Sequence, residues 1–439
     1  MNTMKKTIIL TVCAVITAFT QLASAQENKP EVRPFQVGIV YPLSTNGTQA
    51  PKIANVFSVN GFMGMSAGVE AAEFSGFMSI TNGNVNGVQG SGFLNINRGN
   101  VHGAHGAGFC NISKDVEGIQ ASGFCNMAKN VKGVQASGFI NLSDNCKGVQ
   151  GSGFIGIAKN IKSVQGAGFI CIADTVTGIQ ASGFANVADQ NKGVQATGFI
   201  NISGDNDGMQ GAGFMNTSKN IKGVQIAGFL NIAKDIDGAQ IAGFLNKAQK
   251  VKGSQISGFL NIADSSNYPI GIINLVKNGT KQLVVETDEN TAVNVIFKSG
   301  GRYTYGIIGL SYLPIISEAK YGIIAGIGGH LPISTSFAID ADLVSNFYYD
   351  YSFKKTGYKS FSNNQFRLLF NYKINNRISI FAGPKLNLWS SEIHDIDDLR
   401  GLKLWSGTHN HHISHYNHFN YQYSRLLLGA SAGIEINLK

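Results

Sequence analysis

The chain has 439 residues, of which 54 are Gly and 8 are Pro, and only 14% are charged. A hydrophobic content of 43% is too high for a disordered chain, and the lack of a strict Gly-x-y spacing excludes collagen. The net charge of +9 comes from basic residues scattered singly, whereas a nucleic-acid-binding protein would gather them on one stripe. We therefore expect a Gly-rich β-protein with no nucleic-acid partner.

The first 25 residues have the pattern of a secretory signal peptide. Lys5 and Lys6 precede an apolar stretch over residues 7–19, and Ala23-Ser24-Ala25 forms a cleavage site. Cys13 lies inside the apolar stretch and does not follow a small residue, so we do not expect a lipid anchor on it. After residue 25, no run of 18 apolar residues could form a transmembrane helix. We expect an exported protein that is cleaved after Ala25.

A fifteen-residue repeat dominates the chain. The dipeptide Gly-Phe occurs 14 times between Gly61 and Phe259. Successive Gly-Phe copies are one repeat length apart, except that the second and third spacings are longer by one residue. Gln stands three residues before this Gly in eleven copies, and Asn stands three residues after it in ten. Glu73 and His105 take the Gln position in two early copies. Such a unit is too short to fold alone and must stack on its neighbours.

Alternation within each repeat predicts β-strands. In one repeat, Val134, Ala136, Ile140 and Leu142 share one parity, and Gln135, Ser137, Phe139 and Asn141 share the other. Gly at two fixed phases marks sharp corners. A parallel β-solenoid and an antiparallel meander both fit, and we favour the solenoid because every unit carries the same turn residues at the same phase. About thirteen coils at ~4.8 Å each would form a rod on the order of 60 Å long.

Stacked coils predict ladders of identical side chains. The Gln and Asn positions would form structural amide ladders, exemplified by Gln120, Gln135, Gln150, Asn126 and Asn141. Cys110 and Cys125 share one phase in neighbouring coils, so their Cα atoms would lie ~5 Å apart. Both stacked free thiols and a disulfide fit this spacing. The Asp residues of the array stand singly at the turn phase, as solvated turn residues do, rather than as the paired carboxylates of a sugar-cleaving site.

The C-terminal third predicts an antiparallel barrel. Twelve of the 14 Tyr and both Trp lie after residue 300, where strands of about ten residues alternate apolar and polar side chains. We expect eight strands, at 281–287, 292–298, 303–312, 320–330, 334–347, 364–374, 377–389 and 424–438. Short turns alternate with mostly longer loops between them, as in outer-membrane barrels. A barrel of eight strands is filled by side chains, so it would be an anchor and not a pore.

A His-rich segment lies in the predicted loop 390–423. Its candidate metal ligands are His409, His411, His412, His415 and His418, with His394 further upstream. Such tracts can bind Zn, Ni or Cu, although no Cys accompanies them and a polar loop explains the composition equally well.

Units of the form G-V-Q-x-x-G-F-x-N, together with the stretch from Pro42 to Thr48, resemble a family of exported surface-repeat proteins of Gram-negative gut bacteria. The resemblance covers nearly the whole mature chain and implies a cell-envelope location, but no catalytic residues. The pattern is broken at five positions, where we expect the ladders to be interrupted: Glu73, His105, Ser79, Gly156 and Cys171.

Together these features predict an all-β protein: signal peptide 1–25, N-terminal strand or cap 26–60, repeat array 61–275 and β-barrel 280–439. We expect a non-enzymatic protein of the outer membrane or cell surface, with no cofactor. Its partners would be outer-membrane lipid and a glycan or another envelope component. The alternatives are a solenoid enzyme that cleaves glycans and a metal-binding receptor that uses the His residues.

Overall fold

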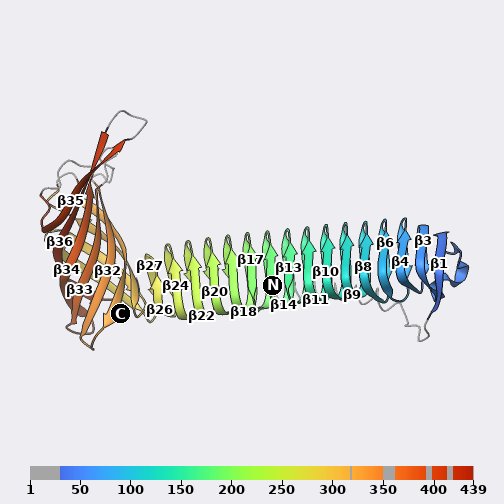
Figure 1. Ribbon diagram of the computed structural model, residues 1–439. Helices are drawn as coiled ribbons and strands as arrows, with labels where there is room; N and C mark the ends of the chain where they lie inside the picture. Colours follow the sequence, from blue (N-terminus) through green and yellow to red (C-terminus); the bar gives the residue numbers. More distant parts are fainter. Residues whose placement is uncertain (1–29, 317–318, 350–360, 392–397, 413–418, 439) are drawn as a thin grey trace. The chain divides into compact units, whose positions relative to one another are not determined.

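The structure is a computed structural model that describes residues 30–316, 319–349, 361–391, 398–412 and 419–438. It is almost entirely β-structure, with a parallel β-solenoid of about 15 turns and a closed eight-stranded antiparallel barrel (Figure 1). The predicted fold class is confirmed, and parallel pairing rules out the meander. Among the described residues, no helix is long and apolar enough to cross a membrane. The chain divides into two compact units, one ending at Ala227 and one beginning at Gly228.

The first unit consists of solenoid coils. A 3-10 helix, η1 (Gly47–Lys52), precedes β3. The strands of this unit are β1 (Glu31–Val40), β2 (Leu43–Ser44), β3 (Ile53–Ser66), β4 (Gly68–Ser75), β5 (Met78–Thr81), β6 (Val85–Ser91), β7 (Leu94–Asn97), β8 (Asn100–Ala107), β9 (Cys110–Ser122), β10 (Cys125–Ser137), β11 (Ile140–Ser152), β12 (Ile155–Ile161), β13 (Val164–Ala167), β14 (Ile170–Val176), β15 (Ile179–Ser182), β16 (Ala185–Asn191), β17 (Val194–Thr197), β18 (Ile200–Ala212), β19 (Met215–Thr217) and β20 (Asn220–Ala227).

The register of these strands follows the repeat. Parallel pairing begins with β1 and β3, and from β9 onward each residue pairs with the equivalent residue of the next repeat, as Gln135 does with Gln150. Gln89 pairs with His105, a step that is longer by one, as the early Gly-Phe spacings require. Equivalent side chains therefore stack directly on one another. Two such rows, one with Val116 and Val131 and one with Ala128 and Ala158, form an apolar cluster in the core.

Glycine is required where coils turn. Gly133 has a φ of +134°, and a Cβ atom there would lie 2.1 Å from the carbonyl oxygen of Gly118 in the preceding coil. At the Gly-Phe corner, a Cβ on Gly138 would lie 2.1 Å from the carbonyl oxygen of Gly123. A side chain at either position would crowd the preceding coil, which explains why Gly recurs at both phases along the array, with Ser163 as an exception at the first phase.

The second unit begins with further coils and ends in the barrel. Its solenoid strands are β21 (Leu230–Ile232), β22 (Asp235–Ala242), β23 (Leu245–Lys247), β24 (Lys250–Ser257), β25 (Leu260–Ala263), β26 (Ser265–Ile270) and β27 (Ile273–Val276). The last coil is hydrogen-bonded to the barrel, because the Asn274 amide N–H donates to Ser299 Oγ at 3.0 Å and Thr304 Oγ1 donates to the carbonyl oxygen of Pro269 at 2.8 Å.

The barrel consists of β28 (Thr280–Asp288), β29 (Val293–Gly300), β30 (Thr304–Tyr312), β31 (Tyr321–Pro332), β32 (Phe337–Tyr349), β33 (Phe361–Lys373), β34 (Ile378–Ser391) and β36 (Phe419–Asn437). These strands match the eight predicted ones, and the antiparallel pairing of β28 with β36 closes the barrel. The prediction of an uninterrupted loop over 390–423 is wrong. Residues Leu402–His412 form a ninth strand, β35, which pairs with the first part of β36 and extends that side of the barrel.

Candidate functional site

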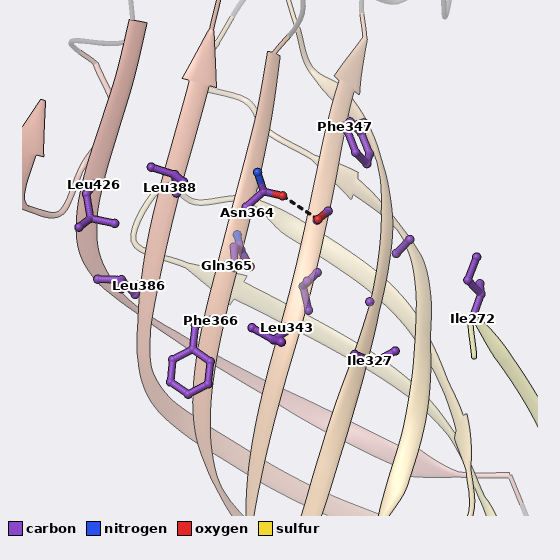
Figure 2. A pocket seen from close by; sticks show the side chains of 14 residues that line it. Ile272, Ile327, Leu343, Phe347, Asn364, Gln365, Phe366, Leu386, Leu388 and Leu426 are labelled. Carbon is purple, nitrogen blue, oxygen red and sulfur yellow. Dashed lines mark hydrogen bonds between the residues drawn. The ribbon is translucent and has the colours of Figure 1, made fainter. Parts of the chain in front are cut away.

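The outer wall of the barrel is apolar. Leu343 on β32 and Phe366 on β33 are 56% and 48% exposed, although both are large hydrophobic side chains. Figure 2 shows Leu343, Phe366 and Leu386 on neighbouring strands. With Leu388 and Leu426 they line an outward groove of about 700 Å³. A soluble barrel would place polar side chains here, so this wall has the polarity of a surface in contact with lipid.

The height of this apolar band fits a bilayer. Along β32, outward side chains run from Phe337 to Phe347. Ten residues at ~3.4 Å each, tilted by about 40°, span roughly 26 Å, close to the ~25 Å band of outer-membrane barrels. Tyr312 pairs with Tyr321, and Tyr321 pairs with Tyr349, at the end where the longer loops emerge. Phe337 pairs with Tyr372 at the opposite end. Aromatic residues therefore border the band on both sides, as membrane girdles do.

The interior of the barrel holds a charge network. Lys298 Nζ donates to Glu435 Oε1 at 2.7 Å and to Asp340 Oδ2 at 3.2 Å. These three side chains are almost fully buried. The three residues come from β29, β32 and β36, so only closure of the barrel brings them together. Buried charges are tolerated when they are paired in this way.

A second ion cluster lies in the same lumen. Arg367 Nη1 donates to Glu286 Oε1 at 2.7 Å, and its Nη2 donates to Asp342 Oδ2 at 2.7 Å. Tyr305 donates its hydroxyl to Asp342 Oδ1 at 2.5 Å. The inward parity of Arg367, Asp342 and Glu435 was evident from the sequence alternation. Their partners Lys298 and Glu286 were not identified, because short-range periodicity carries no information on pairing across the lumen.

Aromatic packing fills another level of the lumen. Trp389, Tyr348 and Phe361 are buried together, and the ring centroids of Phe361 and Trp389 lie 5.2 Å apart. Leu313 and Leu427 pack against them. In the described part of the barrel the lumen is thus occupied by ion pairs at one level and by apolar side chains at another, which is the arrangement of a filled barrel.

The Gln residues of the array form a buried ladder. Gln135 Nε2 donates to Gln120 Oε1 at 3.0 Å, and Gln150 Nε2 donates to Gln135 Oε1 at 2.9 Å. All three side chains are fully buried. Because each amide donates to one neighbour and accepts from the other, the buried polar groups satisfy one another along the stack.

The Asn residues form a parallel ladder. Asn126 Nδ2 donates to Asn141 Oδ1 at 3.0 Å and to the carbonyl oxygen of Ala136 at 2.6 Å. The second bond ties each Asn to the opposite wall of its coil. The ladder is interrupted at Gly156 and Cys171, which pair in register with Asn141 and Asn186. These amides are committed to internal bonds.

Two ionisable residues stand in the Gln ladder. Glu73 pairs in register with Gln89, and Gln89 pairs with His105. Burial raises the pKa of Glu73 to about 7, although a hydrogen bond from Ser66 to Glu73 Oε2 acts in the opposite direction. Burial also lowers the pKa of His105 to about 3. In the described part of the chain, Glu73 Oε1 and both ring nitrogens of His105 have no hydrogen-bond partner.

The Phe residues of the repeat form a ladder on the surface. Phe124 and Phe139 stack at 4.9 Å between ring centroids, and Phe139 and Phe154 stack at the same distance. Each ring is only partly covered. Both faces of an internal ring lie against its neighbours, so only the ring edges are open to a ligand.

Acidic side chains on the coils bind the next coil. Asn130 Nδ2 donates to Asp115 Oδ1 at 2.5 Å, and Lys159 Nζ lies 3.1 Å from Asp144 Oδ1. These groups form rows of single carboxylates with an amide or an ammonium group. A glycan-cleaving site would need two carboxylates that face each other.

The structure places part of the His-rich segment on a strand. His409, His411 and His412 pair with Gln422, Asn420 and Phe419 of β36. His394, His415 and His418 lie outside the described residues. Among the described residues, no group of three or more His, Cys, Asp or Glu side chains is placed to hold a metal ion.

Comparisons with models of protein families, with curated proteins and with solved structures give no match to this chain.

Proposed function

We propose that this protein is a non-enzymatic outer-membrane protein in which the barrel is a lipid-embedded anchor and the solenoid is a rigid scaffold. The inverted polarity of the barrel carries this proposal, since exposed side chains such as Leu343 and Phe366 surround a lumen that contains Lys298 and Arg367. Such an arrangement is stable only if lipid covers the outer wall.

The lengths of the loops support one orientation of the barrel in the membrane. The described turns 301–303, 333–336 and 374–377 are short, whereas the opposite end of the barrel carries the longer connections together with one short turn, 289–292. The last coil is bonded to Ser299 and Thr304, next to a short turn. Because outer-membrane barrels have short periplasmic turns, we propose that the coils enter the barrel from the periplasm.

The scaffold role rests on the internal use of the polar groups. The Gln and Asn amides bond to one another, Asp115 bonds to Asn130, and the Phe ring faces stack within their ladder. These features fit a structural spacer better than an enzyme. They equally fit a surface that binds a glycan or another envelope component through ring edges and side-chain rows.

Membrane fractionation tests the anchor. The full chain is expected in the outer-membrane fraction, to resist extraction by carbonate or urea, and to require detergent for solubility. Phe366→Arg places a charge at the middle of the lipid-facing band and should cost about 2–4 kcal/mol of membrane insertion. Val134→Arg, on the exposed wall of a coil, is the matched control and should leave fractionation unchanged. A wild-type chain that stays soluble without detergent would refute the proposal.

Protease treatment tests the orientation. In intact cells the repeat array should be protected, and after the outer membrane is permeabilised it should become accessible. Cleavage of the array in intact cells would place the coils at the cell surface instead.

A further inference from the structure

We propose that Cys110 and Cys125 form a disulfide that links two consecutive coils of the exported protein. The two residues begin β9 and β10 and are direct partners in the parallel register. They occupy one row of an apolar cluster, between Leu94 and Ile140. Both side chains are buried.

The geometry of this pair suits a covalent bond. Partners on adjacent parallel strands lie about 4.8 Å apart, within the Cα separation of roughly 4.4–6.8 Å that disulfides span. The structure holds both residues as free thiols, with their Sγ atoms 2.6 Å apart, closer than two unbonded sulfur atoms normally lie. The two sulfur atoms thus already face each other without rearrangement of the backbone.

The other two cysteines lack such a partner in register. Cys146 pairs with Val131 and Ile161, and Cys171 pairs with Gly156 and Asn186. Burial raises the pKa of Cys146 to about 11 and that of Cys171 to about 12, and the pKa of Cys110 is raised as well, so the register and not thiol acidity distinguishes the pair. Cys146 and Cys171 provide internal controls on the same chain.

The position of the pair suggests a purpose. Leu94 pairs with Cys110 across one of the early repeats that is one residue longer than the others. Cys110 pairs with Cys125 across a repeat of regular length. The link therefore joins the first coils that keep the regular spacing throughout. The adjoining coil carries His105, where the Gln ladder is broken. A covalent link here would hold the coils together at the place where the amide ladder is interrupted.

Formation of the link is a two-electron oxidation. One thiolate attacks the disulfide of an exported thiol–disulfide oxidant and gives a mixed disulfide, and the second thiolate displaces the oxidant. The two protein thiols lose two electrons and two protons, and the oxidant leaves as a dithiol. An oxidising compartment outside the cytoplasm is required, so this inference rests on the proposed export.

Peptide mapping tests the link directly. Trypsin cleaves after Arg98, Lys114 and Lys129, so Cys110 and Cys125 fall on the separate peptides 99–114 and 115–129. Cells are quenched with acid, and the full chain is alkylated in denaturant without reductant, purified, digested and analysed by mass spectrometry. We expect the two peptides joined and two hydrogens lighter than their sum, with near-complete loss of alkylated 99–114. Cys146 and Cys171 should carry the alkyl group.

Matched variants separate the possible outcomes. Cys125→Ser should restore alkylated 99–114, and Cys146→Ser should leave the joined peptides unchanged. Alkylated Cys110 and Cys125 in a chain that fractionates with the outer membrane would overturn the link but not the proposed function. A chain found in the cytoplasm would overturn the proposed export itself. Joined peptides that contain Cys146 would show a different pairing and also overturn the inference.

Discussion

Replacing Glu73 by Gln is expected to stabilise the first coils and to change how their stability depends on pH. Glu73 is fully buried in the Gln ladder, and burial raises its pKa to about 7, from an ordinary value of 4.5. The folded state therefore favours the protonated carboxyl. Its contribution to stability is fully present below pH 4.5 and is lost as the pH rises to 7. The loss is on the order of 3 kcal/mol. Glu73→Gln should remove this loss, because an amide continues the ladder at every pH.

His105 acts in the opposite direction. Burial lowers its pKa to about 3, from an ordinary value of 6.5. The neutral ring is favoured, so its contribution is present above pH 6.5 and is lost as the pH falls toward 3. Between pH 8 and pH 5 the two effects nearly cancel in the wild-type chain. As the pH falls from 8 to 5, the coils of the Glu73→Gln variant should lose roughly 2 kcal/mol of stability, and those of the His105→Gln variant should gain roughly 2 kcal/mol.

Amide hydrogen exchange provides the assay. The full chain is labelled at pH 8, 6.5 and 5, with labelling times scaled to the intrinsic exchange rate so that only the opening equilibrium differs. The relevant peptides cover β4 to β8. The double variant should show a flat profile. Identical pH profiles for wild type and Glu73→Gln would refute the reasoning, as would a Glu73→Gln variant that is less stable than wild type at pH 8.

Three further predictions concern the coils and the barrel. Gly133→Ala should destabilise its coil by about 1–3 kcal/mol, because Gly133 has a positive φ and a Cβ there would clash with Gly118. Gly151→Ala is the control, since a Cβ at Gly151 would meet open space, and it should change coil stability little. Equal effects of the two substitutions on hydrogen exchange would contradict the requirement for Gly where the coils turn. Gln135→Leu removes the donor to Gln120 and should cost about 1–3 kcal/mol in the same assay, so unchanged protection would show that the ladder contributes nothing. Arg367→Met leaves buried carboxylates without their ion-pair partner and should lower the free energy of unfolding by about 3–5 kcal/mol, measured by urea unfolding of the barrel in detergent. An unchanged free energy of unfolding would mean that the interior of the barrel is hydrated.

The repeat made the coils predictable. A constant period with Gly, Gln and Asn at fixed phases requires stacked equivalent positions, and the structure pairs Gln135 with Gln150 and Asn126 with Asn141. The parity within a repeat was also evident. Which parity faces inward was not, because ordinary hydrophobicity would bury Val134 and expose Gln135, and the structure does the reverse. Stacking decides this, since an amide row can satisfy itself only when it is continuous.

Strand positions in the barrel were likewise evident from local alternation, whereas β35 was not. Leu402–His412 has a composition that suits a polar loop, and it becomes a strand because β36 extends past the end of β28 and offers a free edge. Pairings such as Lys298 with Glu435 join residues 137 positions apart, and no local pattern encodes them.

The excess of Gly, the low charge and the constant repeat spacing by themselves determined a β-protein of stacked coils followed by antiparallel strands. These are short-range properties, since a coil corner and a strand face depend on a few neighbouring residues. The tertiary structure alone decided that the coils bury amides, that Lys298 meets Glu435 and Arg367 meets Glu286 across the lumen, and that Leu402–His412 forms a strand. Each of these depends on which distant segments come into register, and the register is set by closure of the barrel and by stacking of whole coils.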